Sequence, residues 1–315
     1  MIELSVVSPV YNEADCLELF ASELTDVLKD MQIEWEWICV NDGSSDNTLE
    51  IARKLKQSIP QMKIINLSRN FGHQIAVKAG VDHVEGRACV IIDADLQDPP
   101  KIIAEFYAKM KTGGYDVVYA VRNERAGESW FKKFTANLFY RLIQKITDVS
   151  MPLDTGDFRI ISARVIKILQ SLKESRPYLR GLISWMGFKQ TGIVINRDAR
   201  IAGKTKYSLN KMLKLAWNGI AHFSTWPLHM CTALGLLIST ISTVWMAHAL
   251  YVRFVLRVTV PGWTSILIAV LLLGSVQLIT LGIIGSYLGR VYDEVRRRPL
   301  YLIQDIEGCD DKSIS

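Results

Sequence analysis

Two long uncharged stretches in the second half of this chain constrain its fold more than any other feature. Residues 215–252 and 258–289 contain no Lys, Arg, Asp or Glu. Each is longer than the ~20 residues that cross the hydrocarbon of a bilayer. We therefore expect a hairpin of two transmembrane helices, at 225–252 and 258–289, preceded by a juxtamembrane helix at 208–224. The alternative is a pair of buried core helices, although such runs are rare in soluble domains.

Basic residues flank this hairpin on both sides. Four precede the first span and four follow the second: Lys204, Lys206, Lys211, Lys214, Arg290, Arg296, Arg297 and Arg298. Cytoplasmic flanks carry such an excess, so we expect both termini and the tail 290–315 in the cytoplasm. Arg253 and Arg257, between the spans, run against this orientation but are fewer. The first residues lack a signal peptide's basic and apolar regions, which agrees with a cytoplasmic N-terminal domain.

Residues 1–207 are expected to form this cytoplasmic α/β domain. Short β-rich runs lie at Leu4–Val10, Glu34–Val40, Met62–Leu67, Ala88–Ile92 and Asp116–Val121. Amphipathic stretches separate them, at Glu13–Lys29, Asp46–Lys56, Gln74–His83 and Lys101–Lys111. This alternation is typical of a mostly parallel, doubly wound sheet. Each run ends in polar residues, so a ligand site is expected at the carboxyl edge of the sheet.

Composition adds little to this reading. The net charge of +5 and pI near 8.8 permit contact with anionic lipid or phosphorylated ligands without requiring it, and we expect no nucleic-acid partner. The five cysteines are scattered without a C-x-x-C pair, which argues against a disulfide framework and against a zinc site.

A pair of carboxylates, Asp93 and Asp95, follows the apolar run Cys89–Ile92, with Gln97 just beyond. Oxygen ligands of this kind suit Mg²⁺ or Mn²⁺, with a substrate diphosphate completing the coordination. The loop Asn41–Asp46 also follows a strand. Capping of the next helix explains Ser45 or Asp46 but leaves Asp42 free to bind a base or ribose.

A further amphipathic stretch, residues 130–146, has Phe and Leu at helical spacing among Lys and Arg. It is expected either to lie in the membrane interface or to pack as an ordinary helix on the domain.

Four ordered blocks resemble the family 2 glycosyltransferases, which have the GT-A fold: Pro9–Glu13, Asn41–Ser44, Asp93–Pro100 and Thr155–Arg159. The two spans and the segment Arg200–Ser208 resemble one group within that family, the polyisoprenyl-phosphate glycosyltransferases. Bactoprenol glucosyltransferases and dolichol-phosphate mannose synthases belong to this group. The resemblance extends over nearly the whole chain.

Roles for individual residues follow from this resemblance alone. It implies a nucleotide-sugar site of Pro9, Tyr11, Glu13, Val40, Asp42, Asp93, Ala94, Gln97, Arg122, Arg200 and Lys206. Asp93, Asp95 and Gln97 would surround a Mg²⁺ or Mn²⁺ ion, and Asp95 and Asp157 would be catalytic. Lys132, Lys133 and Arg159 would meet the acceptor phosphate. Asn41 stands where the family more commonly has Asp, so no role follows for its side chain.

The resemblance further implies an inverting hexosyltransferase of the inner or plasma membrane. Our first choice is transfer of glucose from UDP-glucose to undecaprenyl phosphate, as in O-antigen modification of lipopolysaccharide. Mannose, N-acetylglucosamine and aminoarabinose remain alternatives. Two other functions also remain alternatives. One is a processive polysaccharide synthase, although no Q-x-x-R-W motif is present, and the other is an inactive membrane scaffold. A homo-oligomer, and a flippase or a downstream glycosyltransferase as partner, are also expected.

Overall fold

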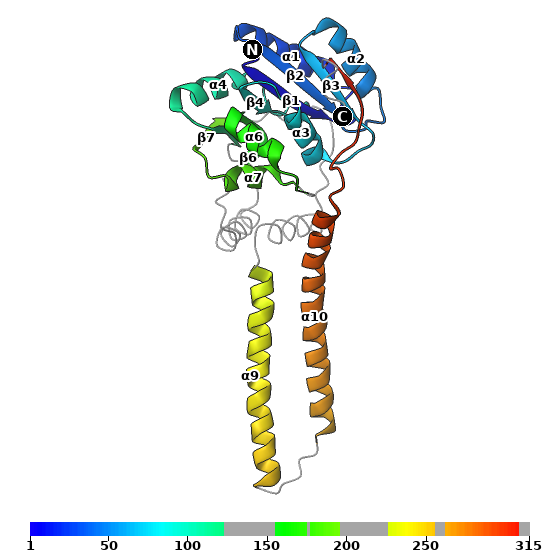
Figure 1. Ribbon diagram of the computed structural model, residues 1–315, viewed down its shortest axis with the longest axis vertical. Coiled ribbons are helices and arrows are strands. Elements are labelled where there is room, and N and C mark those ends of the chain that lie inside the picture. Colours follow the sequence, from blue (N-terminus) through cyan, green and yellow to red (C-terminus); the bar gives the residue numbers. More distant parts are fainter. Residues whose placement is uncertain (123–154, 175–176, 196–225, 256–261, 309–315) are drawn as a thin grey trace, which may run out of the picture. The chain divides into compact units, whose positions relative to one another are not determined.

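The computed structural model describes residues 1–122, 155–174, 177–195, 226–255 and 262–308 (Figure 1). These residues fall into two compact units. One holds residues 1–122, 155–174, 177–195 and 298–308, and the other holds 226–255 and 262–297. The predicted helices at 130–146 and 208–224 lie outside the described residues.

An eight-stranded sheet forms the centre of the first unit, in the order β7-β5-β6-β4-β1-β2-β3-β8. Its strands are β1 Leu4–Val10, β2 Trp35–Asn41, β3 Met62–Leu67, β4 Ala88–Ile91, β5 Val117–Arg122, β6 Thr155–Ser162, β7 Gln190–Ile195 and β8 Ile303–Glu307. Strands β4, β1, β2 and β3 are parallel neighbours, while β6 runs antiparallel between β4 and β5. The first five strands lie where the sequence predicts them. The mostly parallel α/β fold is thereby confirmed.

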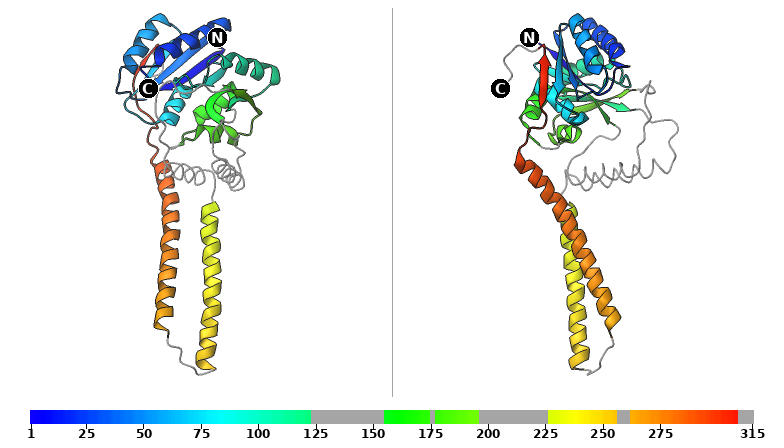
Figure 2. Two further views of the ribbon diagram at one scale, coloured as in Figure 1. Left: turned by 180° about the vertical axis from the view of Figure 1, so that it is seen from behind. Right: turned by 90° about the vertical axis from the view of Figure 1, so that its right-hand side faces the viewer.

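Helices cover both faces of this sheet (Figures 1 and 2). They are α1 Leu17–Asp30, α2 Thr48–Ser58, α3 His73–Asp82, α4 Ile102–Gly113, α6 Ala163–Ser171 and α7 Leu179–Trp185. Successive strand residues point to opposite faces, so Val6 packs in the core under α1, α2 and α4, whereas Val7 packs under α3, α6 and α7. Burial on both faces explains why these strands read as continuous apolar runs.

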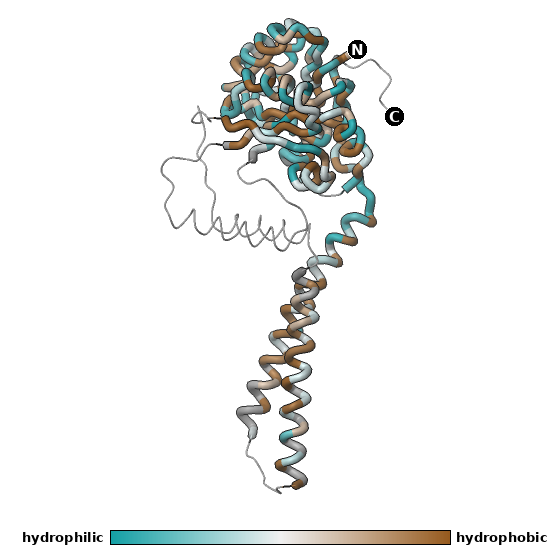
Figure 3. Tube along the Cα trace, turned by 90° about the vertical axis from the view of Figure 1, so that its left-hand side faces the viewer, coloured by the Kyte–Doolittle hydropathy of each residue, from teal (hydrophilic) through white to brown (hydrophobic). Residues whose placement is uncertain are grey.

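The second unit consists of α9 Trp226–Phe254 and α10 Trp263–Arg296, which lie side by side (Figures 1 and 2). Apolar side chains are exposed on both, including Leu236 at 65% and Leu278 at 72%. Figure 3 shows that hydrophobic residues predominate along both helices. Among the described residues, one segment, Leu272–Arg296, is long and apolar enough to cross a bilayer. A shorter apolar segment, Met230–Trp245, lies in α9. The two-span hairpin and its orientation therefore stay predictions.

Strand β8 is an element that the sequence analysis does not contain. From the sequence, residues 290–315 were expected to form only a tail. Instead, α10 continues to Arg296 and residues 303–307 pair antiparallel with β3. The preceding Tyr301 donates a hydrogen bond from its hydroxyl to Asp82 of α3 at 3.0 Å. The strand is short and half polar, which gives no strand signal when it is read alone.

Candidate functional site

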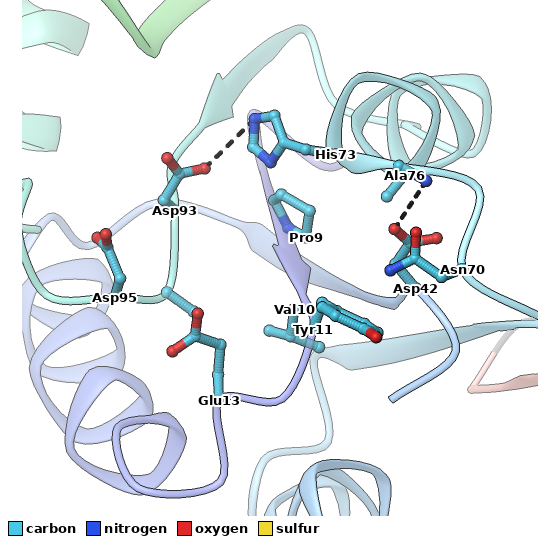
Figure 4. Close-up of a pocket in the computed structure, with 12 residues that line it drawn as sticks. Pro9, Val10, Tyr11, Glu13, Asp42, Asn70, His73, Ala76, Asp93 and Asp95 are labelled. Atoms are coloured by element: carbon cyan, nitrogen blue, oxygen red, sulfur yellow. Dashed lines mark hydrogen bonds and ion pairs between the residues drawn. The ribbon is translucent and has the colours of Figure 1, made fainter. Parts of the chain in front are cut away.

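Loops after four parallel strands enclose a cavity of about 250 Å³ at the carboxyl edge of the sheet. Its lining comprises Pro9, Val10, Tyr11, Glu13, Asp42, Asn70, Gly72, His73, Ala76, Asp93, Ala94 and Asp95. Figure 4 shows Asp93, Asp95 and Glu13 on one side and Asp42 and Asn70 on the other, with Pro9 and Tyr11 between them. The cavity thus has two chemically distinct ends.

Asp42 ties the loop after β2 to the loop after β3. Its two carboxylate oxygens accept the backbone N–H groups of Phe71 at 2.7 Å and Gly72 at 3.0 Å. Burial raises the pKa of Asp42, against the opposing effect of these two bonds. The next residue, Gly43, has φ +66°, and a Cβ there would lie 2.4 Å from the carbonyl carbon of Arg69. Only glycine allows the two loops to approach this closely.

Asp93 and Asp95 follow β4 in a loop where Leu96 adopts a left-handed φ of 57°. Burial, together with the neighbouring carboxylates Asp157 and Asp95, raises the pKa of Asp93 to about 6. Its Oδ1 is buried and has no hydrogen-bond partner among the described residues, and it forms an ion pair with His73 Nε2 at 3.7 Å (Figure 4). Asp95 is held differently, since its Oδ1 accepts the backbone N–H of Gln97 at 3.1 Å.

This carboxylate pair fits a divalent cation. The buried Asp93 oxygen accepts no hydrogen bond among the described residues, which leaves it able to bind a cation, and hard oxygen donors are what Mg²⁺ and Mn²⁺ prefer. Among the described residues, no group of three or more His, Cys, Asp or Glu side chains could hold an ion. An ion here would therefore need further oxygens from a ligand, as a diphosphate supplies.

Asp157, on β6, is the centre of a second polar cluster beside Asp93. Its carboxylate accepts hydrogen bonds from His73 Nε2 at 3.0 Å, Gln74 Nε2 at 3.2 Å and Arg180 Nε at 2.8 Å. Burial would raise the pKa of Asp157, but the His73 bond and the Arg180 charge outweigh it and hold that pKa well below its usual range. The pKa of His73 is raised. Burial alone would lower it, but the carboxylates of Asp157 and Asp93 favour the protonated imidazole.

Asp157 is predicted from the sequence, but its three partners are not. His73 and Gln74 begin α3, directly after the polar end of β3, and Arg180 lies on α7. The one sequence signal for His73 as a site residue was its position just after the end of a strand, where ligands bind in parallel sheets. Its contact with Asp157 depends on β6 lying antiparallel beside β4, which no local pattern specifies.

The structure gathers only part of the predicted donor site in this cavity. Val40 is buried in the core, and the side chain of Gln97 does not line the cavity. The side chain of Arg122, at the end of β5, lies outside the described part of the structure. Arg159 is 4% exposed and donates to the backbone carbonyls of Gly156 and Asp157. Burial lowers its pKa to about 10. Lys132, Lys133, Arg200 and Lys206 lie outside the described residues.

The described lining of the cavity is acidic. It includes the carboxylates of Glu13, Asp42, Asp93 and Asp95 but no Lys or Arg. A phosphorylated ligand would be repelled by four carboxylates unless cations offset them. A metal ion at Asp93 and Asp95 would supply such charge.

Comparison with known proteins places the chain among sugar-transferring enzymes. Residues 5–169 match the family described as Glycosyl transferase family 2. An uncharacterized glycosyltransferase of Bacillus subtilis (strain 168), YkcC, is 47% identical over 313 residues, which are 99% of this chain and 97% of that protein. A prophage bactoprenol glucosyl transferase homolog of Escherichia coli (strain K12) is 35% identical over 97% of this chain and 100% of its own length.

Solved structures give a more distant match. The mannosyltransferase PcManGT from Pyrobaculum calidifontis, solved with GDP-Man and Mn²⁺, is 15% identical with a TM-score of 0.45. The match covers 92% of this chain and 84% of that one.

Proposed function

This chain belongs to glycosyltransferase family 2 and is a hexosyltransferase, and from that premise we propose that it moves a single sugar from a nucleotide-diphosphate sugar to a polyprenyl phosphate. Glucose from UDP-glucose and undecaprenyl phosphate are our first choices. The bactoprenol glucosyl transferases of Shigella phages SfII and SfX, each 36% identical over 96% of this chain, support the lipid acceptor and the sugar.

The observation that carries this proposal is the two-ended cavity. Asp42 lies at the end suited to a nucleoside, where a carboxylate can accept hydrogen bonds from a base or ribose, and Tyr11 lies between the two ends. Asp93 and Asp95 lie at the end suited to a metal-bound diphosphate. A nucleotide-diphosphate sugar has these same two parts joined, and its sugar would then emerge toward His73 and Asp157.

A metal ion and two basic side chains would act on the leaving diphosphate in this proposal. A divalent ion held by Asp93 and Asp95 would neutralise the charge that develops on it. Arg200 and Lys206, predicted from the sequence, would add positive charge at the same place. Lys132 and Lys133 keep their predicted role toward the acceptor phosphate. Arg159 does not, because it is buried and donates to the backbone carbonyls of Gly156 and Asp157.

Asp157 acts in this scheme by position rather than by removing a proton. The acceptor is a phosphate whose second pKa is near ~6, so its attacking oxygen is already largely ionised at neutral pH. The three donors to Asp157 keep it an anion, with a weak affinity for protons. It orients His73 and Arg180 around the site of attack. Direct displacement at the anomeric carbon would invert the sugar's configuration.

A polyprenyl acceptor also gives the apolar helices a purpose. The lipid tail cannot leave the bilayer, so the enzyme must work at its surface, and the exposed apolar side chains of α9 and α10 suit burial in lipid. We propose an inner or plasma membrane protein with two spans, both termini in the cytoplasm and 130–146 in the interface. Small residues along α10, from Gly274 to Gly289, would permit close contact between copies.

The decisive experiment is a panel of radiolabelled UDP- and GDP-sugars tested with purified protein, Mg²⁺ or Mn²⁺ and undecaprenyl phosphate. We expect one sugar, glucose first, on the extracted lipid. Mannose, N-acetylglucosamine or aminoarabinose on the lipid would correct the donor but keep the reaction. A growing polymer would show a processive synthase instead, and no transfer from any donor would show an inactive scaffold.

A further inference from the structure

A line of side-chain hydrogen bonds leads from strand β8 to the cavity. Asp305 Oδ2 accepts from Asn66 Nδ2 at 2.8 Å, and Asn66 Oδ1 accepts from Asn41 Nδ2 at 2.8 Å. Asn41 Oδ1 then accepts the backbone N–H of Ser44 at 3.2 Å. We name Asp305, Asn66 and Asn41 the polar ladder, since they occupy matching positions on the neighbouring strands β8, β3 and β2.

The ladder has a direction, which Asp305 sets. An ionised carboxylate only accepts hydrogen bonds, so Asn66 must turn its NH₂ toward Asp305 and its oxygen toward Asn41. Asn41 must then donate its own NH₂ and keep its oxygen for Ser44. Asn41 and Asn66 are 1% and 4% exposed, so neither amide can satisfy a lost bond with bulk water. An Asp at position 41 would break this order.

The inner end of the ladder fixes the loops that carry the nucleoside end of the cavity. Asn41 directly precedes Asp42, and Ser44 Oγ accepts the backbone N–H of Asn12 at 3.1 Å. The backbone N–H of Ser45 donates to Asn12 Oδ1 at 2.9 Å. Asn12 lies between Tyr11 and Glu13, which both line the cavity. The ladder therefore bears on the loops after both β1 and β2.

The outer end of the ladder is itself held in place. Arg53 of α2 donates to Glu307 at 2.6 Å and lies 3.4 Å from Asp305 Oδ1, the oxygen that Asn66 does not use. The backbone N–H of Ser68 donates to the carbonyl of Leu302 at 2.9 Å. Together with the Tyr301 bond to Asp82, these contacts fix where the Asp305 carboxylate lies.

We propose that Asp305 is a positioning residue for donor binding, which acts through Asn66 and Asn41 to hold the loop 41–46 in the shape that receives the nucleoside. This inference rests on the proposed function, in that the donor is a nucleotide sugar. A loop that is already ordered spares the ligand the cost of ordering it, so loss of the ladder weakens donor affinity more than turnover.

The test compares Asp305→Leu with Asp305→Asn in the full-length protein. Leu removes the acceptor, and we expect the donor KM and the Kd of UDP with Mn²⁺ to rise about five- to tenfold, with kcat at saturating donor within about twofold. Asn keeps an oxygen for Asn66, so its KM and Kd are expected to match the unmodified protein. Gln304→Leu, at an exposed position of the same strand, is the matched control.

A second variant tests the direction of the ladder. Asn41→Asp places an acceptor against the Asn66 oxygen, so its UDP Kd should rise. Adding Asp305→Asn allows Asn66 to turn round, donating to position 41 and accepting from position 305, and should restore the Kd. A merely structural role would make the double variant worse than either single one.

The outcomes separate this inference from the proposed function. Unchanged UDP affinity in Asp305→Leu, or equal losses in Asp305→Leu and Gln304→Leu that follow their melting temperatures, would overturn the ladder. UDP and GDP binding is measured without acceptor, so it tests the ladder whether or not sugar is transferred. Failure of sugar transfer in the unmodified protein would refute only the proposed function. Binding of neither nucleotide by the unmodified protein would refute both.

Discussion

His73 Nε2 lies 3.0 Å from Asp157 Oδ2 and 3.7 Å from Asp93 Oδ1, so one imidazole bridges the carboxylate of β6 and the first carboxylate after β4. Each carboxylate raises the pKa of His73, whose protonated form compensates part of their charge. The imidazole thereby links the proposed metal-binding end of the cavity to the Asp157 cluster. The arrangement makes His73 as informative a target as either aspartate.

His73→Ala should therefore lower kcat by about 10- to 100-fold while raising the donor KM less, because Asp157 loses one of its three donors and its orientation. Initial rates at saturating donor and lipid phosphate measure this. His83→Gln is the control, since His83 caps the opposite end of α3 and bonds only its own helix at Ala79. A kcat in His73→Ala equal to that of His83→Gln would contradict the assignment.

Asp95→Ala should abolish sugar transfer, by about a thousandfold or more, while insertion into membranes persists. The carboxylate is proposed to hold the cation that stabilises the leaving diphosphate, an effect of several kcal/mol. Activity with purified protein and excess Mg²⁺, together with the Mn²⁺-induced shift in melting temperature, measures both consequences. Asp26→Ala, at an exposed position of α1, should behave as the unmodified protein. Full activity of Asp95→Ala would remove the metal assignment.

Gly43→Ala should raise the donor KM about tenfold, because its Cβ would meet backbone atoms of Arg69 and Asn70 at 2.4 and 2.6 Å and push the two loops apart. Gly114→Ala is a matched control. Gly114 has a similar φ of +57° but nothing within 4 Å of its Cβ. Both variants should melt lower, since a left-handed alanine costs about 1–2 kcal/mol. Only Gly43→Ala should change KM, and equal KM values would refute the close-approach argument.

The carboxylate of Asp116 should stabilise the folded protein at neutral pH and lose this effect in acid. Arg164, followed by Ser162, donates to this carboxylate, and these bonds lower its pKa below the unfolded value near ~4. The stabilisation is therefore present above pH ~4 and lost as pH falls through the lowered pKa. Asp116→Asn should melt about 2–4 °C lower at pH 7, with a smaller difference near pH 3. A difference that is constant over this range would show that the charge is irrelevant.

Local sequence patterns were enough to predict β1 to β5, since each strand is buried on both faces and reads as a β-rich run between amphipathic helices. They were also enough to bring Asp42, Asp93 and Asp95 to one edge, because parallel strands end together there. Strands β6, β7 and β8 were missed. Of these, β6 pairs antiparallel between two parallel neighbours, and β8 reads as a charged tail.

What sequence reasoning could not supply are contacts made across strands that are distant in the chain. Asn41 had no predicted role, because its partner Asn66 becomes adjacent only when β2 and β3 pair in their particular register. Likewise, Arg180 meets Asp157 only after α7 folds back beside β6. Side chains whose function depends on strand order remain invisible to any reading of local periodicity.

Strand β8 also sets an order of assembly. The ribosome makes the chain from its N-terminus, so β1 to β7 can fold while the residues of α9 and α10 are still being added. The edge of β3 stays open until residues 303–307 emerge, after both apolar helices are complete. The Asn66 amide has no Asp305 to bond before that point. Synthesis thus leaves the proposed donor pocket unfinished until α9 and α10, which precede β8, have both been made.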